Sequence, residues 1–252
     1  MQVHNQKHTL EFARISDIVP EKPETYGSIF LTIDIDWAND EVINQTIDII
    51  EKANVEATWF ITHNTPIISR LAANPKFELG IHPNFNFLLD GDFRNGSDIR
   101  SIIENLIEIV PNAKSLRSHS LFTSTKLLQL MPNYGLTHES NIYIDRCNLN
   151  QLKPFRIWND VIRVPHSFED DLFLLTHNSY SPTFNNYMKD YIFNNDNVRI
   201  LDFHPIHVFL NTEKISRYES TRSIHNNPEE LIKYRYKGEG TRTALEILLR
   251  LS

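Results

Sequence analysis

The sequence predicts an α/β fold, with strands and helices alternating around one parallel sheet or barrel. Apolar runs of strand length alternate with stretches of helical period along most of the chain. With 252 residues, 40% of them hydrophobic, the chain can bury one large core. No internal repeat or long linker marks a second domain. Because strand–helix alternation with right-handed crossovers lays successive strands side by side in one direction, the strands are expected to be parallel.

The first third of the chain predicts three strands and two helices in alternation. Residues 28–36 form an apolar, β-branched run that predicts a buried strand, and Asn39 can cap a following helix of about 13 residues. Residues 55–61 alternate like a second strand. Pro66 stands at the favoured first position of a second helix, and residues 77–82 predict a short strand that ends on a histidine.

The middle of the chain continues this alternation. Ser97 opens the clearest helix in the sequence, and Pro111 stops it. Residues 114–117 predict a strand, and Ser124 can cap a short helix that runs through Met131.

The last part of the chain has weaker patterns. Short strand-like pieces, among them 142–144 and 161–164, lie between residues 134 and 175. A late strand spans residues 198–204, and Thr241 can cap a last amphipathic helix.

The N-terminal stretch differs from the rest. It contains Pro20 and Pro23 and has little periodicity. We therefore predict an N-terminal arm over residues 1–27, lying over a domain formed by residues 28–252.

Composition excludes several classes of function. The net charge is −7 and the pI about 5.9, and no block of lysine or arginine follows a helix or loop, so nucleic acid and anionic membranes are poor partners. Cys147 is the only cysteine, which excludes an internal disulfide and a cysteine-based zinc site. The N-terminal residues are polar, and no apolar run approaches about 18 residues, so we expect no signal peptide, no transmembrane segment and a cytoplasmic location.

Polar side chains follow four of the predicted strands at the point where each one ends. Carboxyl ends of parallel strands are where α/β folds keep their chemistry. An aspartate pair there can equally cap the next helix, and a single histidine is more often a surface or core imidazole. The repetition of polar strand ends is what points to a metal hydrolase site, formed by Asp34, Asp36, His82, Arg117, His119, His204 and His207.

The order of these segments resembles the polysaccharide deacetylase family, the NodB-homology domain of carbohydrate esterases. The matching segments read Thr-Ile-Asp-Ile-Asp at 32–36, Glu-Leu-Gly-Ile-His-Pro-Asn-Phe-Asn at 78–86, Arg-Ser-His-Ser at 117–120 and Ile-Leu-Asp-Phe-His at 200–204, with a vaguer match at 163–171. The resemblance covers residues 28–210 and is greatest to the subgroup linked to bacterial O-antigen and capsule clusters. It implies a distorted, TIM-like β/α barrel.

The resemblance also implies a divalent metal ion, with zinc as the expected ion, held by Asp36 and His82. Asn86 stands where the family has its second metal-binding histidine. Its amide oxygen could still bind a metal, although more weakly than an imidazole would. His119, at the next strand end, is an equally good candidate for the third ligand.

The same resemblance gives catalytic roles to three residues. Asp34 would take a proton from a water molecule, and His204 would protonate the leaving amine. Arg117 would orient Asp34 and keep it charged. Trp37 and His207 are the expected substrate contacts.

The sequence thus predicts a metal-dependent hydrolase that removes an N-acetyl group from an acetamido sugar of a bacterial surface polysaccharide. Without a signal peptide, the substrate could be a nucleotide-linked or lipid-linked precursor. Two alternatives stay open: an allantoinase-like hydrolase of another C–N bond, and a non-catalytic relative that binds glycan. Asp34 argues against the second alternative, since a binding module needs no base beside a metal ligand.

Overall fold

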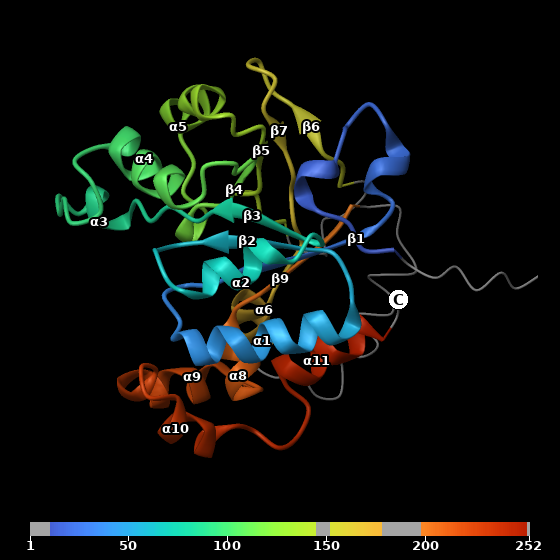
Figure 1. Cartoon of the computed structure of the whole chain (residues 1–252), viewed down its shortest axis with the longest axis vertical. Coiled ribbons are helices and arrows are strands. Elements are labelled where there is room, and N and C mark those ends of the chain that lie inside the picture. The colour runs from blue at the N-terminus through green and yellow to red at the C-terminus, as the bar shows by residue number, and fades with distance from the viewer. Residues whose placement is uncertain (1–10, 145–151, 178–197, 251–252) are drawn as a thin grey trace, which may run out of the picture.

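A computed structural model describes residues 11–144, 152–177 and 198–250. Its centre is a curled sheet with helices packed around it (Figure 1), and the strands follow the order β6-β7-β5-β4-β3-β2-β1-β9-β8. Neighbouring strands are parallel except for the antiparallel pair β6 and β7. The predicted α/β class is confirmed, and within the described ranges the sheet forms a half-barrel ending at β6 and β8. The strands are β1 Ile29–Asp34, β2 Ala57–Ile61, β3 Phe77–Ile81, β4 Ser115–Leu116, β5 His138–Glu139, β6 Phe155–Arg156, β7 Ile162–Arg163, β8 Phe168–Glu169 and β9 Arg199–Phe203.

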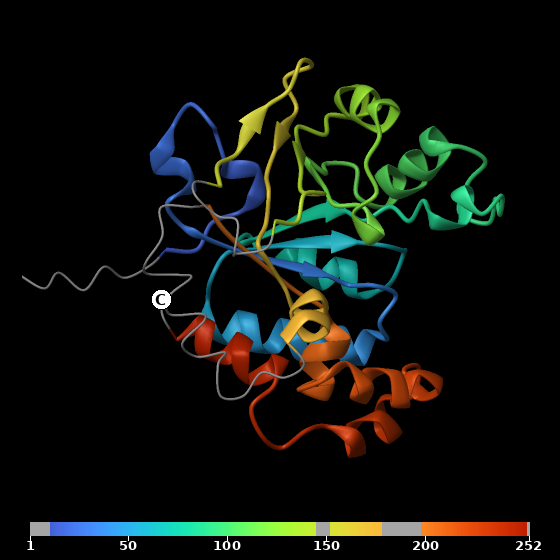
Figure 2. The same ribbon diagram turned by 180° about the vertical axis from the view of Figure 1, so that it is seen from behind.

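Helices cover the convex face of the sheet and its carboxyl end. Helices α1, α8 and α11 lie together on one side, and α9 and α10 follow α8 at the same end of the molecule (Figures 1 and 2). None of the helices in the described ranges has the length and apolar character needed to cross a membrane. The α-helices are α1 Asp40–Ala53, α2 Ile67–Ala73, α3 Asn86–Leu89, α4 Ile99–Ile109, α5 Thr125–Leu130, α6 Asp170–His177, α8 Pro205–Leu210, α9 Ile215–Thr221, α10 Pro228–Leu231 and α11 Thr241–Leu249. Short 3₁₀ turns join them, η1 Ile15–Asp17, η2 Pro23–Tyr26, η3 His119–Leu121, η4 Met131–Tyr134, η6 Arg222–Ile224 and η7 Ile232–Tyr234.

Strand β1 lies between β2 and β9 and is the third strand from the β8 edge of the sheet. All six of its residues are buried, as the run 28–36 predicts. Because side chains alternate along a strand, Phe30, Thr32 and Asp34 share one face of β1. Thr32 stands beside Asp202 of β9 in the register. This face is the concave one and carries the polar side chains.

Helix α1 has the capping residue and the buried apolar face that its sequence predicts. The Asn39 side chain accepts a hydrogen bond from the backbone N–H of Glu41 at 2.9 Å, which satisfies one of the free donors at the helix start. The helix ends at Asn54, whose left-handed φ of 56° stops the helical path. Its apolar side chains are buried, as predicted for an amphipathic helix.

Four predicted details are wrong. Pro66 stands at the N-cap of α2, so Ile67 and not Pro66 is its first residue. Helix α4 is capped by Asp98 and not by Ser97: the Asp98 carboxylate accepts from the N–H of Ser101 at 2.8 Å. Helix α11 has Gly240 at its N-cap, so Thr241 is already helical. Residues 142–144 form no strand, and only Tyr143 makes a single parallel bridge, to His166.

The described part of the N-terminal arm does not lie over the sheet but enters its concave side. Ile15 and Ile18 are fully buried in an apolar cluster with Phe30 and Phe60. The backbone N–H of Ile15 donates to Thr58 Oγ1 at 3.0 Å. The arm therefore fills the amino-terminal half of the concave side and leaves the carboxyl end open. The domain boundary at residue 27 stays a prediction.

Candidate active site and metal centre

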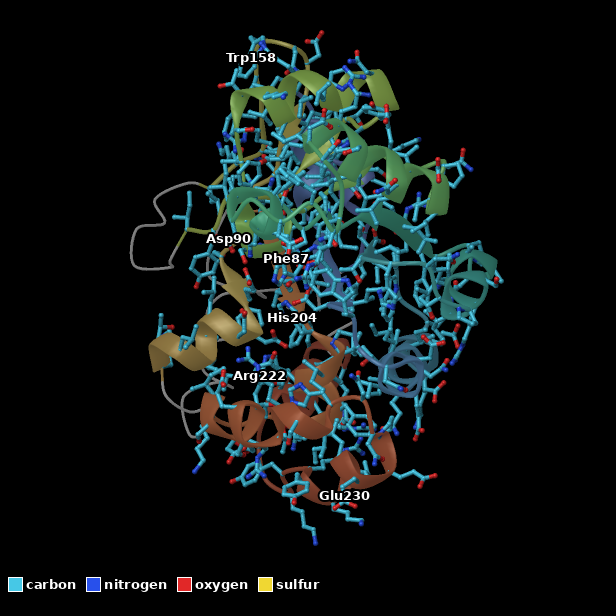
Figure 3. All side chains as sticks on the ribbon, turned by 90° about the vertical axis from the view of Figure 1, so that its left-hand side faces the viewer. Phe87, Asp90, Trp158, His204, Arg222 and Glu230 are labelled. Atoms are coloured by element: carbon cyan, nitrogen blue, oxygen red, sulfur yellow. The ribbon has the colours of Figure 1, made fainter. Side chains whose placement is uncertain are left out.

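The carboxyl ends of β1, β3, β4 and β9 surround a cavity of about 280 Å³. Figure 3 looks toward this side of the molecule, with His204 near the centre of the view. Strands β1, β3 and β9 each deliver a polar side chain at or just after their last residue, because the inward face of the strand continues into the following turn. The cavity is lined by Asp34, Asp36, His82, Ser118, His119, Ser120, Leu121, Glu169, Asp171, Leu172 and His204.

Asp36, His82 and His119 form a cluster whose candidate ligand atoms all lie within 4.8 Å of one another. Asp36 Oδ1 lies 3.2 Å from His82 Nε2 and 3.2 Å from His119 Nδ1. Around a tetrahedral zinc ion with ligand distances near 2.0–2.1 Å, neighbouring ligand atoms lie about 3.3 Å apart. One carboxylate and two imidazoles also suit such an ion and leave one position open. These residues fit a divalent metal.

His82 supplies a second test of this fit. It is only 2% exposed, and neither ring nitrogen has a hydrogen-bond partner. The nitrogens are nonetheless close to carboxylate oxygens: besides the Asp36 contact, Nδ1 lies 3.4 Å from Asp34 Oδ2. Atoms that lie side by side without aiming at one another are expected where several ligands face a common ion. A buried polar atom without a partner costs about 1–3 kcal/mol, which coordination would offset.

The two candidates for the third ligand are placed differently. His119, in the turn η3 after β4, lies at the cluster. Asn86, the first residue of α3, does not line the cavity, and its side-chain amide donates to Ser120 Oγ at 3.0 Å. The geometry therefore favours His119 over Asn86.

The backbone is strained on both sides of the ligand cluster formed by Asp36, His82 and His119. Asp36 and Trp37, directly after β1, have φ values of 40° and 54°. Ser120 and Leu121, in η3, have φ values of 56° and 54°. Such left-handed conformations cost non-glycine residues about 1–3 kcal/mol each and gather at functional sites. Here they turn the chain sharply where Asp36 and His119 meet.

Arg117 is a fully buried cation that joins two carboxylates. Its Nη1 donates to Asp34 Oδ1 at 3.1 Å and also to Asp202 Oδ1. The guanidinium lies 4.7 Å from the ring centre of Phe60, and the Ser140 hydroxyl accepts from Nη2 at 3.0 Å. Burial lowers the pKa of Arg117, but the charges of Asp202 and Asp34 outweigh burial and raise it. Arg117 therefore stays charged and holds Asp34 in place.

Asp202 is the member of this group that sequence reasoning missed. It is fully buried, and its Oδ2 has no hydrogen-bond partner. Burial raises the pKa of Asp202 well above its usual range, Arg117 opposes this, and the charge of Asp34 adds to it. A carboxylate inside a strand gives no pattern by which the sequence could have marked it.

His204 is fixed by Asp170, which the sequence placed only within the vague match at 163–171. Asp170 Oδ1 lies 2.7 Å from His204 Nδ1, and its Oδ2 accepts from the His204 backbone N–H at 2.9 Å. Burial lowers the pKa of His204, but the adjacent Asp170 raises it well above its usual value. The other ring nitrogen, Nε2, lies 3.6 Å from Asp36 Oδ2. His204 is therefore a charged donor that faces the ligand cluster of Asp36, His82 and His119.

Glu169 and Asp171 complete the wall of the cavity beside His204. Burial, together with the charges of Asp171 and Asp202, raises the pKa of Glu169 well above its usual range. Glu169 Oε2 lies 3.0 Å from His166 Nε2. The wall therefore presents two acidic side chains beside His204, of which Glu169 is the one with the raised pKa.

Trp37 and His207, the predicted substrate contacts, line an adjoining cavity of about 500 Å³. Trp37 is 40% exposed and meets the His119 ring edge-on at 5.1 Å between centres. His207 is buried, with Nδ1 3.1 Å from Thr212 Oγ1. A larger cavity of about 700 Å³ lies between α1 and α11, but none of the predicted site residues lines it.

Comparisons with known proteins agree with this geometry. A family model described as WbmS-like polysaccharide deacetylase matches residues 31–222. A crystal structure from Bordetella bronchiseptica, described as a polysaccharide deacetylase involved in O-antigen biosynthesis, is 45% identical, with a TM-score of 0.88 over 95% of this chain and 97% of that one. A structure from Mycobacterium smegmatis, also described as a polysaccharide deacetylase, shares the fold at 15% identity, with a TM-score of 0.50 over 70% of this chain and 77% of that one. No curated protein sequence matches.

The family model spans more than half of the chain, and its range contains Asp34, Asp36, His82, Arg117 and His204. The Bordetella bronchiseptica protein matches nearly the whole chain, well above the identity at which only the fold is shared. The chain belongs to the WbmS-like polysaccharide deacetylase family.

Proposed function

We propose that this protein is a metal-dependent N-deacetylase that acts on an acetamido sugar during the synthesis of a bacterial O-antigen. The observation that carries the proposal is the arrangement around the 280 Å³ cavity. A metal-ligand set, Asp36, His82 and His119, lies between a carboxylate held by arginine, Asp34, and a histidine held by aspartate, His204. Metal-dependent amide hydrolysis uses a metal ion, a general base and a general acid together.

Asp36, His82 and His119 would hold the divalent ion. When bound there, the ion would polarise the amide carbonyl and lower the pKa of a water molecule. Asp34 would take a proton from the attacking water, because one of its oxygens faces the ligand His82 at 3.4 Å while the other accepts from Arg117. The Arg117 contact orients the carboxylate.

His204, on the side of the cavity opposite Asp34, would complete the reaction as the proton donor to the leaving nitrogen. After water adds to the amide carbon, the C–N bond breaks and the leaving nitrogen takes a proton from Nε2 of His204. The products are acetate and a free amino sugar. Asp170 keeps this histidine charged before the transfer and fixes which ring nitrogen faces the cavity. Asp34 would therefore end the reaction with one more proton and His204 with one fewer, and proton exchange with water would restore both.

The first test is the metal content of the purified protein, measured by elemental analysis before and after resupply of zinc. We expect near-stoichiometric metal in the wild type and in Asn86→Ala, and its loss in His82→Ala and His119→Ala. Deacetylation is followed as acetate release from N-acetylated saccharides, with allantoin as the probe for the alternative hydrolase. A wild type that binds no divalent metal after resupply would contradict the proposal, as would hydrolysis of allantoin alone.

A further inference from the structure

A buried polar layer lies behind the catalytic cavity, the space of about 280 Å³ described above. It consists of Thr32 on β1, Asp202 on β9 and Arg117, the residue that follows β4. All three side chains are fully buried, and none of them lines the catalytic cavity or the adjoining one. The layer can therefore affect the reaction only through the cavity residues that it contacts, above all Asp34.

Arg117 reaches Asp34 from a distant strand. In the sheet, β3 and β2 lie between β4 and β1 (Figure 1), and the guanidinium passes over the ring of Phe60 on β2. At one edge of the guanidinium, Nε donates to the Ser140 carbonyl oxygen at 3.3 Å and Nη2 to the Ser140 hydroxyl at 3.0 Å. A plane held along one edge can still tilt about that edge. The place of Nη1, which faces Asp34, therefore depends on what Nη1 itself contacts.

Nη1 of Arg117 has three acceptors around it, although it carries only two hydrogen atoms. Thr32 Oγ1 lies at 2.9 Å and Asp34 Oδ1 at 3.1 Å, and Asp202 Oδ1 also accepts from Nη1. Thr32 and Asp202 are opposite each other in the register of β1 and β9, and the Thr32 hydroxyl donates to Asp202 Oδ1 at 2.6 Å. Two of the three acceptors are thus bonded to each other independently of Asp34.

Asp34 depends on Arg117 for its own orientation. Within the described ranges, the bond from Arg117 is the one hydrogen bond that the Asp34 side chain makes, and its Oδ2 lies 3.4 Å from His82 Nδ1. The direction of the carboxylate therefore follows the place of Nη1. A general base must lie within hydrogen-bond reach of the proton that it takes, and a displacement of about 1 Å costs on the order of 100-fold in rate.

We propose that Asp202, together with Thr32, is a positioning residue of the deacetylation. The pair fixes Nη1 of Arg117, and Arg117 in turn directs the Asp34 carboxylate at the attacking water. This inference rests on the proposed deacetylase function and adds no proton transfer to it. What Asp202 supplies is a fixed hydrogen-bond acceptor at Oδ1, since its Oδ2 has no hydrogen-bond partner.

The test measures kcat and KM for acetate release from N-acetylated saccharides by the zinc-loaded protein. Asp202→Leu, which has a similar size but no acceptor, should lower kcat about 100-fold and leave KM within about twofold. Asp202→Asn keeps an acceptor at the same place and should retain kcat within about threefold. The zinc content should be that of the wild type in both variants. Equal losses of kcat in the two variants, or a raised KM with unchanged kcat, would overturn the inference.

Thr32→Val tests the same arrangement with a smaller change, because valine keeps the branched shape and removes only the hydroxyl. We expect kcat to fall about tenfold. Thr58→Val is the matched control, at the buried threonine beside Thr32 in the register of β1 and β2. Glu139→Gln is a second control, at a buried carboxylate that pairs with Arg163 and lines neither cavity. Both controls should keep the wild-type kcat, and a fall as large as that of Thr32→Val would point to a general loss of structure and reject the inference.

A double-mutant cycle tests whether Asp202 acts through Arg117. Arg117→Met removes the guanidinium and keeps a long side chain. Adding Asp202→Leu to Arg117→Met should lower kcat by no more than about twofold, because no Nη1 is left to place. The double variant is expected to fold, since apolar residues can replace a buried ion pair. Losses that multiply would mean that Asp202 acts by another route and would contradict the proposal.

Nuclear magnetic resonance of the Arg117 guanidinium separates failure of this inference from failure of the proposed function. A guanidinium held at Nη1 gives separate proton signals for its two Nη groups, whereas a rotating one gives merged signals; Arg117→Met identifies them. Separate signals in the wild type that merge in Asp202→Leu and Thr32→Val support the inference. Signals already merged in the wild type, or still separate in both variants, reject it. A zinc-loaded wild type that hydrolyses no N-acetylated saccharide would instead reject the deacetylase proposal, while these signals still decide whether Asp202 and Thr32 place Arg117.

Discussion

The two halves of the concave face differ in what their buried groups contribute. In the amino-terminal half, Ile15 and Ile18 pack against Phe30 and Phe60, and the side chains are fully buried and apolar. The carboxyl-terminal half contains backbone strain at Asp36 and an imidazole whose two nitrogens have no hydrogen-bond partner. The first half is arranged as a folding core is. The carboxyl-terminal half keeps strained backbone and unpaired buried nitrogens, and the free energy that these cost would be offset only by a bound ligand.

This difference gives the arm a definite role. By filling the amino-terminal half, it provides apolar packing directly beneath the buried polar layer of Arg117, Asp202 and Thr32. A rigid base of this kind keeps charged side chains in one arrangement, because close packing leaves them no alternative rotamers. Stability and chemistry are thus assigned to opposite ends of the same strands.

The largest loss of stability should follow a change in the amino-terminal half. Ile15→Ala removes a fully buried side chain and leaves a sealed void, so the free energy of unfolding should fall by about 2–5 kcal/mol. Activity per folded molecule should not change, because Ile15 lines neither the catalytic cavity nor the adjoining cavity of about 500 Å³. Urea denaturation together with acetate release measures both. Leu89→Ala, at a side chain 66% exposed, is the control. Loss of activity without loss of stability would break the division between the two halves.

The sequence was sufficient for the fold class because its signals are local. The Asn39 cap, the apolar face of α1 and the polar ends of β1, β3 and β9 each depend on a few neighbouring residues. The sequence could not reveal that residues 11–27 enter the concave side of the sheet. Ile15 and Ile18 lie in a short segment without periodicity, and only the space left between distant strands determines where they pack.

The contacts between side chains of the candidate site were also hard to predict, because they join residues that are distant in the sequence. Asp170 precedes His204 by 34 residues, and the two meet only because β8 pairs with β9. The choice between His119 and Asn86 depends on the turn η3, with its left-handed residues, and on the direction of α3. Both facts belong to the tertiary structure, since neither spacing nor residue type settles them.

A smaller, pH-dependent loss should follow a change in the carboxyl-terminal half. Asp170→Asn removes a charge-assisted hydrogen bond to His204, which is worth about 1.5–3 kcal/mol. The folded-state pKa of His204 is raised, so this stabilisation is complete below the unfolded-state pKa of about 6.5 and is lost as the pH rises through the folded-state pKa. The difference in unfolding free energy between metal-free wild type and variant should therefore be largest near pH 6 and shrink at alkaline pH. Asp48→Asn, at a surface carboxylate, should show no such trend, and a constant difference would contradict the assigned pair.

The smallest effect on stability should come from the residue with the largest effect on metal binding. His82→Ala in the metal-free protein removes two buried nitrogens without partners, and the space it leaves opens into an existing cavity. The gain from removing them opposes the lost packing, so the free energy of unfolding should change by less than about 1 kcal/mol. Zinc should then stabilise the wild type by an amount that rises with the logarithm of its concentration, and should not stabilise the variant. Thermal unfolding with and without zinc measures both. A metal-free His82→Ala protein several kcal/mol less stable than the wild type would show that this half of the concave face is also part of the folding core.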